Sequence, residues 1–303
     1  MYNEPTKLFG NSIPMKILVV GANGQLGRNV VSELKQRNHE CVSCDIAGDV
    51  DFVMDATNLE ETRNKINEIK PDAVINCAAW TAVDAAEDEE NKTKVYALNV
   101  NIPHNLKVVC KELGCKLMHI STDYVFDGKG ETPWKPDDKN YAPLCYYGET
   151  KLKGELEVCE LDEYFIVRIA WLFGGPISFV NTMLKVGKTH DEVRVVNDQI
   201  GTPTYSKDLA RLLVDMIETD KYGYYHATNE GGYISWYDFC VEIYKQAGMN
   251  TKVIPVTTAE YGLSKAVRPF NSRLDKSKLV ENGFTPLPDY KDALSRYLKD
   301  YNG

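Results

Sequence analysis

Tyr147 and Lys151 are the residues of this sequence whose types and spacing most directly indicate chemistry. They lie four positions apart in the segment Tyr-Tyr-Gly-Glu-Thr-Lys at residues 146–151. On a helix, positions i and i+4 share a face, so the ammonium group can lie beside the phenol and lower its pKa. A phenol with a lowered pKa is a better proton donor or acceptor near neutral pH. The pair therefore predicts acid–base chemistry.

A glycine-rich turn lies far upstream of this pair, directly after the apolar run at residues 16–20. Its spacing is G-x-x-G-x-x-G, one residue longer at the front than the G-x-G-x-x-G dehydrogenase motif. Glycines let the backbone approach a pyrophosphate at the N-terminus of a helix, where free N–H groups and the helix dipole favour an anion. The turn predicts a dinucleotide site, and together with the Tyr–Lys pair it indicates hydride transfer. The residues predicted to bind the cofactor here are Gly21, Asn23, Gly24, Gln25, Leu26 and Gly27.

Two acidic residues extend the predicted cofactor site. Asp45 ends the second predicted strand, where a carboxylate can accept hydrogen bonds from both ribose hydroxyls of NAD and repel a 2′-phosphate. Asp45 therefore favours NADH as the cofactor, and NADPH stays open. Asp55 is placed to meet the adenine amino group. The alternatives are a solvated loop acid for Asp45 and an acid at a helix N-terminus for Asp55.

Apolar strand-like runs alternate with helical patterns through the first half of the chain. Near-continuous apolar strands separated by helices are typical of a parallel sheet that is covered on both faces. We therefore expect an α/β fold with a Rossmann-type, doubly wound parallel sheet. The predicted strands are 16–20, 41–45, 73–77, 117–121 and 165–170. The predicted helices begin at Gly24 or span 59–69, 95–113 and 147–160.

The regular alternation weakens after residue 173, which predicts a second, smaller lobe. Short strands are expected at 193–197 and 224–226, and helices at 206–218 and 236–246. The predicted organisation is an N-terminal extension at 1–14, a cofactor-binding domain at 15–173 and a mainly substrate-binding lobe at 174–303, with some segments returning to the first domain. Ligands of such folds bind at the carboxyl ends of the strands, so the glycine turn, Asp45 and residues 77–79, 121–122 and 170–171 should meet at one crevice.

Composition excludes several function classes. The net charge of −9 argues against a nucleic-acid or anionic-membrane partner, because a phosphate backbone normally requires a basic surface. No apolar run approaches the roughly 18 to 20 residues of a membrane helix. The eight cysteines are scattered, which fits a reduced, cytoplasmic protein, and Cys41 and Cys44 should point to opposite faces of one strand. The five histidines have no metal-ligand spacing, so no metal site is predicted.

Four further motifs carry a resemblance to a known family. They are Ala-Ala-Trp-Thr-Ala-Val-Asp (78–84), Ser-Thr-Asp-Tyr-Val-Phe-Asp-Gly (121–128), Arg-Ile-Ala-Trp (168–171) and Asn-Asp-Gln-Ile-Gly-Thr-Pro-Thr (197–204). With the glycine turn and the Tyr–Lys pair, they make the chain similar to the extended short-chain dehydrogenases/reductases, and within them to the dTDP-4-dehydrorhamnose reductase family. The similarity runs from Met15 nearly to the C-terminus, and the last motif discriminates best from sugar-nucleotide epimerases.

This resemblance implies NAD(P)H-dependent reduction of the 4-keto group of dTDP-4-dehydro-L-rhamnose to dTDP-L-rhamnose. Tyr147 would donate the proton, Lys151 would lower its pKa and hold the nicotinamide ribose, and Thr122 would bind the keto oxygen. The resemblance also implies that Asn99 helps to order the lysine. Further cofactor contacts are expected from Ala78, Ala79 and Trp80. Contacts to the sugar nucleotide are expected from Thr81, Val83, Thr122, Tyr124, Trp171 and Arg268, with Trp171 on the pyranose and Arg268 on the diphosphate.

Other interpretations stay open at this point. A sugar-nucleotide epimerase or dehydratase has the same fold and the same Tyr–Lys pair but returns the hydride to the substrate. A non-catalytic regulatory subunit with this fold is a second alternative, which the intact Thr122, Tyr147 and Lys151 argue against. The nucleotide base, the exact sugar, a structural magnesium and a homodimer are also left open.

Overall fold

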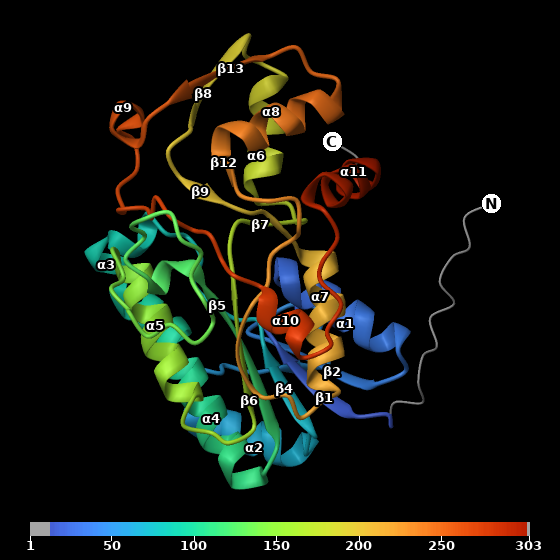
Figure 1. The fold of residues 1–303 in the computed structure, drawn as a ribbon. Coiled ribbons are helices and arrows are strands. Elements are labelled where there is room, and N and C mark those ends of the chain that lie inside the picture. The colour runs from blue at the N-terminus through green and yellow to red at the C-terminus, as the bar shows by residue number, and fades with distance from the viewer. Residues whose placement is uncertain (1–12, 302–303) are drawn as a thin grey trace, which may run out of the picture.

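A seven-stranded, all-parallel sheet forms the centre of the computed structural model, which describes residues 13–301 (Figure 1). The strand order is β11-β6-β5-β4-β1-β2-β3, and each neighbouring pair is parallel. The order reverses at β1, as it does in a doubly wound sheet. The predicted fold class is confirmed. The strands are β1 (Lys16–Val20), β2 (Glu40–Asp45), β3 (Phe52–Val53), β4 (Ala73–Asn76), β5 (Lys116–Thr122), β6 (Tyr164–Ile169) and β11 (Gly223–His226).

Helices cover both faces of this sheet, which explains why its strands read as continuous apolar runs. On β1, Ile17 and Val19 belong to the core under one helix layer, whereas Leu18 and Val20 belong to the core under the other. The first layer contains α1 (Gln25–Gln36) and α7 (Ser206–Ile217), and the second contains α2 (Leu59–Ile69), α4 (Ile102–Leu113) and α5 (Tyr146–Val158). Figure 1 shows the two layers on opposite sides of the strands.

The predicted helix at 95–113 is wrong in one respect. The structure has α3 (Glu89–Tyr96), then a π-helical turn (Ala97–Asn101), and only then α4. Pro103 lies in the first turn of α4, directly after the π-helical turn, and has no N–H to donate to that turn. The π-helical turn adds a residue to the turn before it, and such turns are frequent at functional sites.

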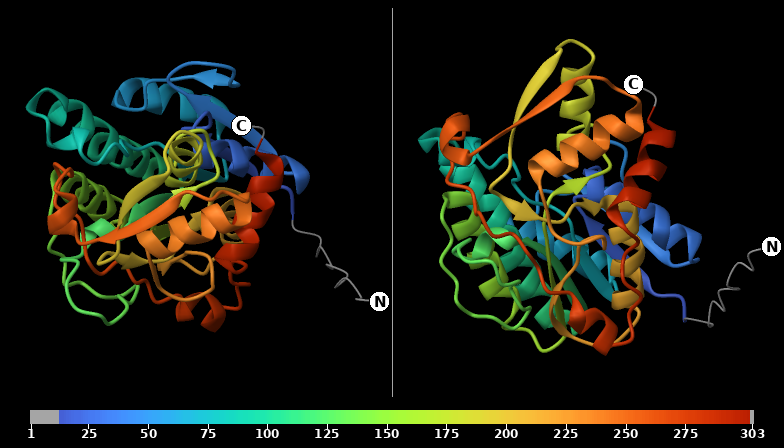
Figure 2. Two further views of the ribbon diagram at one scale, coloured as in Figure 1. Left: turned by 90° about the horizontal axis from the view of Figure 1, so that it is seen from above. Right: turned by 45° about the horizontal axis from the view of Figure 1, so that its top comes forward.

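A second core lies beyond the carboxyl edge of the sheet (Figures 1 and 2). It includes α6 (Phe179–Gly187), α8 (Trp236–Ala247), α11 (Tyr290–Asp300) and the parallel pair of β8 (Glu192–Val196) and β13 (Lys252–Val256). Two further strand pairs join the two parts: β7 (Leu172–Phe173) with β10 (Thr204–Tyr205), and β9 (Ile200–Gly201) with β12 (Ile234–Ser235). The remaining helices, α9 (Thr258–Tyr261) and α10 (Ser277–Glu281), are short.

The C-terminal half contributes β11 and α7 to the central sheet and its helix layer. The predicted boundary between 173 and 174 stays a prediction. The predicted extension at 1–14 lies outside the described residues except for its last two positions.

All eight cysteines are free thiols. Cys41 packs against the core under α1, and Cys44 packs in the core on the opposite face of the sheet, as the strand spacing predicts. Within residues 13–301, no helix is both long and apolar enough to cross a bilayer, and no three His, Cys, Asp or Glu side chains gather as metal ligands would.

Candidate active site

The glycine turn between β1 and α1 packs directly against the segment that follows β4. Gly21 has a φ of 78°, and a Cβ atom added to it would lie 2.6 Å from the backbone nitrogen of Ala78. Gly27 is equally confined, because an added Cβ would collide with the carbonyl oxygen of Gly21. Gln25, the first residue of α1, has a buried Nε2 that no hydrogen-bond acceptor of the described residues meets. A cradle without side chains and an unpartnered polar atom fit a polar cofactor.

Asp45 lies at the end of β2, beside this turn. Its Oδ2 accepts a hydrogen bond from the backbone N–H of Asn23 at 2.9 Å, and its Oδ1 accepts one from the N–H of Ile46 at 2.7 Å. Asn23 Nδ2 donates to the carbonyl oxygen of Ala47 at 2.7 Å. Each carboxylate oxygen keeps a second lone pair. Asp45 is therefore held in place and can still accept hydrogen bonds from ribose hydroxyls.

Asp55 has a local structural partner. Its Oδ1 accepts hydrogen bonds from the N–H of Thr57 at 3.0 Å and from the Thr57 hydroxyl at 2.6 Å, just before Asn58 caps α2. This turn agrees with the alternative role of Asp55, that of an acidic residue at the N-terminus of a helix. Contact between Asp55 and an adenine stays a prediction.

Asn99 ties the segment after β4 to helix α5. It lies fully buried in the π-helical turn, and its Oδ1 accepts a hydrogen bond from the N–H of Trp80 at 2.8 Å. Its Nδ2 donates to the Thr150 hydroxyl at 3.0 Å. Gly154 makes this approach possible, since an added Cβ there would collide with the carbonyl oxygen of Asn99. Asn99 thus acts on the backbone of Trp80 and on the residue before Lys151, and no direct bond joins it to Lys151.

The three residues predicted to be catalytic come from β5 and α5. Thr122 ends β5, and Tyr147 and Lys151 lie on the first two turns of α5; all three are buried. Lys151 Nζ donates to the carbonyl oxygen of Ile120 at 2.6 Å. The Thr122 hydroxyl lies near the Tyr147 phenol and partly offsets the effect of burial on the pKa of that phenol. The structure therefore brings the three side chains together under the carboxyl edge of the sheet.

Burial controls the electrostatics of these groups. It raises the pKa of the Tyr147 phenol, and it lowers the pKa of Lys151 to about 8, because a charge is poorly solvated in the interior. The expectation that Lys151 lowers the pKa of Tyr147 is wrong for this structure: the ammonium group points to Ile120, and burial of the phenol dominates. Burial also raises the pKa of the neighbouring Asp123 carboxyl to about 6.

Aromatic and apolar side chains of the predicted substrate site surround Tyr147. Tyr124 meets it edge to face, with ring centroids 5.4 Å apart, and Val83 and Trp80 pack in the same cluster. The Trp80 indole donates to the carbonyl oxygen of Ala82 at 2.9 Å, which leaves it no N–H for a ligand. Thr81 is exposed. Tyr124 thus contacts Tyr147 directly, and the contacts of these four residues with a ligand stay predictions.

Trp171 lies in a different environment. Its φ of 51° is left-handed, and its ring stacks on Trp236 with centroids 3.7 Å apart. Gly201 leaves room for the indole, since an added Cβ would come within 3.0 Å of that ring. One face of Trp171 is thus covered by Trp236. A pyranose contact therefore depends on the other face or on the edge of the ring.

Arg268 is already paired. Its Nη2 lies 2.7 Å from Asp84 Oδ2, its Nη1 donates to the Tyr124 hydroxyl at 3.1 Å, and its Nε donates to Ser264 Oγ at 3.3 Å. Arg268 can therefore meet a diphosphate only by sharing or exchanging these partners. Asp84 does more than pair with it, because Asp84 Oδ1 accepts hydrogen bonds from the backbone N–H groups of Lys265 and Ala266.

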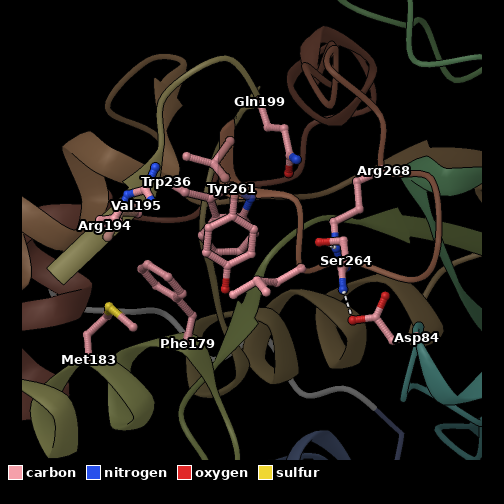
Figure 3. Close-up of a pocket in the computed structure, with 12 residues that line it drawn as sticks. Asp84, Phe179, Met183, Arg194, Val195, Gln199, Trp236, Tyr261, Ser264 and Arg268 are labelled. Carbon is pink, nitrogen blue, oxygen red and sulfur yellow. Dashed lines mark hydrogen bonds and ion pairs between the residues drawn. The ribbon is translucent and has the colours of Figure 1, made fainter. Parts of the chain in front are cut away.

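A cavity of about 330 Å³ opens next to this arginine (Figure 3). Helices α6 and α8, strand β8 and the segment 261–268 provide nearly all of its wall, and the Asp84–Arg268 pair closes one end. Its lining residues are Asp84, Phe179, Met183, Arg194, Val195, Val196, Gln199, Trp236, Tyr261, Leu263, Ser264 and Arg268. Of these, sequence reasoning named only Arg268 as a site residue. The motifs at 78–84 and 197–204 contain Asp84 and Gln199 and were the available signal.

The comparisons with known proteins agree with this geometry. The model of the RmlD substrate binding domain family matches residues 15–302. The spore coat polysaccharide biosynthesis protein SpsK of Bacillus subtilis is 38% identical, and the alignment covers 94% of this chain and 97% of that protein. A crystal structure of a dTDP-4-dehydrorhamnose reductase from Clostridium acetobutylicum is 43% identical, with a TM-score of 0.87 and coverage of 94% and 99%.

A second solved structure is that of dTDP-4-dehydrorhamnose reductase from Bacillus anthracis in complex with NADP. It is 37% identical to this chain, with a TM-score of 0.88, and the match covers 95% of this chain and 100% of the other. A family model and relatives of this identity that span nearly the whole chain establish membership. The chain belongs to the RmlD substrate binding domain family and, within it, groups with the dTDP-4-dehydrorhamnose reductases.

Proposed function

We propose that this protein reduces the 4-keto group of dTDP-4-dehydro-L-rhamnose with NAD(P)H, forming dTDP-L-rhamnose. The observation that supports the proposal is that the Thr122 hydroxyl lies near the Tyr147 phenol, with Lys151 one turn later on the same helix, in a chain of this family. A nicotinamide cofactor supplies the hydride for the keto carbon. The protein must then bind both partners, exclude water and deliver a proton to the oxygen.

The cofactor would be held by the glycine turn and the segments next to it. The N–H groups that begin α1 would bind the pyrophosphate, and the glycines would leave room for it. Asp45 would accept hydrogen bonds from the ribose hydroxyls, while the backbone of residues 78–80, fixed by Asn99, would border the nicotinamide half. Lys151 has N–H groups beyond the one that bonds Ile120 and can donate these to the second ribose.

Tyr147 would donate the proton. As negative charge develops on the keto oxygen, the Tyr147 and Thr122 hydroxyls can both donate hydrogen bonds to it. The raised pKa of the buried phenol keeps Tyr147 protonated at neutral pH, which is the state that a proton donor needs. Lys151, in its charged form, would hold the nicotinamide ribose, which is the second role that the resemblance gives it.

The sugar nucleotide would extend from the cavity to Tyr147. The cavity has apolar walls from Phe179, Met183 and Trp236, which suit a base, and Arg194 and Arg268 supply positive charge for a diphosphate. Arg268 contacts Tyr124, and Tyr124 contacts Tyr147, so the two ends of the site are continuous.

An assay of NADH and NADPH oxidation with 4-keto-6-deoxy sugar nucleotides carrying dTDP, GDP or UDP tests the proposal. We expect stoichiometric cofactor consumption with the dTDP sugar. Conversion of the sugar without net cofactor turnover would indicate an epimerase or dehydratase, and no conversion of any sugar would indicate a non-catalytic subunit.

The position of Asp45 leads us to propose NADH as the preferred cofactor. Asp45→Ala should then weaken NADH more than NADPH, because it removes ribose hydrogen bonds and also a carboxylate that repels a 2′-phosphate. Dissociation constants of both cofactors, measured by quenching of protein fluorescence, check this. Equal losses for the two cofactors would refute the ribose assignment.

The eight free thiols support a reducing, cytoplasmic location, which fractionation of cells would test. A homodimer is a further proposal, which light scattering after gel filtration would test.

A further inference from the structure

Glu155 and Arg168 form a buried ion pair behind the active site. Glu155 lies on α5, one turn after Lys151, and Arg168 lies on β6; both side chains are fully buried. Arg168 Nε donates to Glu155 Oε1 at 2.9 Å, and Arg168 Nη2 donates to Glu155 Oε2 at 2.8 Å. This bidentate pairing fixes both the position and the orientation of the carboxylate.

The other N–H groups of Arg168 are also used. Nη1 donates to the carbonyl oxygen of Pro136 at 3.1 Å and lies 3.4 Å from His226 Nε2, and Nη2 donates to the Tyr141 hydroxyl at 3.1 Å. A guanidinium has five N–H groups, so each has an acceptor. Pro136 and Tyr141 belong to the segment that leads into α5. Arg168 thus connects β6, β11, this segment and the helix that carries Tyr147 and Lys151.

Several groups face Lys151, and their charges differ. They are Glu155 on its own helix, Cys77 after β4 and His119 on β5, while the π-helical turn at 97–101 brings no titratable side chain. Burial raises the pKa of Cys77 to about 12 and lowers that of His119 well below its usual value, so both are uncharged at neutral pH. Among these groups, Glu155 alone belongs to an ion pair, and its carboxylate favours the charged form of Lys151.

We infer that Glu155 and Arg168 are positioning residues for Lys151: Glu155 supplies the charge that keeps the buried lysine cationic, and Arg168 prevents Glu155 from binding the ammonium directly. The inference rests on the proposed function, in which Lys151 acts as a cation. With its carboxylate engaged by Arg168, Glu155 acts on Lys151 through space, and the ammonium stays directed at Ile120 and the crevice. A pair that served stability alone would not need this placement, since apolar residues often replace buried ion pairs without loss.

The two members of the pair must shift the titration of Lys151 in opposite directions. Glu155→Gln leaves the positive charge of Arg168 unbalanced, so the alkaline limb of the kcat/KM profile should move to lower pH by about one unit. Arg168→Gln leaves the carboxylate unbalanced near Lys151, so the limb should move to higher pH by a similar amount. The double variant restores neutrality, and its limb should return close to that of the wild type.

Glu157→Gln is the matched control. Glu157 also lies on α5, but its carboxylate pairs with His104 and Lys107 of α4. Its limb should coincide with that of the wild type. Limbs that coincide in all variants, or that move in the same direction in both single variants, would overturn the inference. If Arg168→Gln does not fold, Glu155→Gln and the double variant still decide the matter, since the limb must move in the first and return in the second.

A second readout separates this inference from the proposed function. The pH dependence of NADH binding, followed by fluorescence, reports Lys151 without any sugar substrate and should shift as the activity profile does. Failure of the proposed function would appear as a wild-type protein that reduces no keto sugar. Failure of this inference would appear as an active wild type and variants whose activity and binding profiles share one alkaline limb.

Discussion

Tyr147 is the residue on which the proposed chemistry most depends. Tyr147→Phe removes the hydroxyl and keeps the ring, so the edge-to-face contact with Tyr124 should survive. We expect kcat to fall by at least ~10²-fold, the usual scale for a positioned proton donor, with cofactor affinity nearly unchanged. Steady-state kinetics together with NADH titration check this. Tyr146→Phe, one residue earlier on an outer face, is the control, and an unchanged kcat in Tyr147→Phe would remove Tyr147 from the mechanism.

The pH dependence of the reaction should follow Lys151. Its pKa is lowered to about 8, so the lysine loses its charge as the pH rises through that value, whereas the phenol, with its raised pKa, stays protonated. The proposed function needs both groups protonated. We therefore expect kcat/KM to fall as the pH rises above about 8. A profile measured in overlapping buffers at constant ionic strength checks the sign, and a flat profile to about pH 10 would contradict it.

At the scale of elements, Asp84 joins the cofactor side of the crevice to the segment 261–268. It accepts hydrogen bonds from two backbone N–H groups of that segment and pairs with Arg268. Asp84→Asn should free this segment and change the charge around Arg268. We expect KM for the sugar nucleotide to rise about tenfold, one to two kcal/mol of binding, while the dissociation constant for NADH stays constant.

Asp88→Asn is the matched control for this variant, because Asp88 pairs with Lys265 of the same segment, and Lys265 is more exposed than Arg268. Its KM should change little, since exposed ion pairs contribute little free energy. Equal effects of the two substitutions would show that Asp84 acts as one more surface charge.

The elements that the sequence predicts well are those with a strong local pattern. The apolar runs of β1 and β5 and the four-residue spacing of Tyr147 and Lys151 each depend on one short segment. The break between α3 and α4 is different, because the helical pattern continues through the π-helical turn and only the backbone shows it. The position of Asn99 and its bond to Trp80 depend on that turn, so sequence could suggest the residue but not its partner.

At the scale of the whole molecule, the site is assembled from parts whose proximity no local pattern reveals. The cavity combines α6, β8, α8 and the segment 261–268 with Asp84, which comes from the other half of the chain. The pKa of Tyr147 likewise depends on how deeply the finished fold buries it, which is why spacing alone gave the wrong sign. Charge pairs such as Arg268 with Asp84 are also a property of the assembled molecule.

This division of the molecule predicts that substrate and cofactor affinity can be changed separately. Trp236 lines the cavity and stacks on Trp171. Neither tryptophan belongs to the core cluster that contains the residues next to the glycine turn. Trp236→Ala should therefore raise KM for the sugar nucleotide about tenfold or more, through lost wall area and a freed Trp171. NADH binding should stay as in the wild type.

Val241→Ala, on an exposed position of the same helix, controls for general effects on α8. Isothermal titration with dTDP and with NADH measures the two affinities independently of turnover. A parallel loss of both affinities in Trp236→Ala would mean that the two halves of the site fold or move as one unit. Loss of dTDP binding alone would show that the second core binds the nucleotide, whereas the carboxyl edge of the sheet binds the cofactor and carries the proton donor.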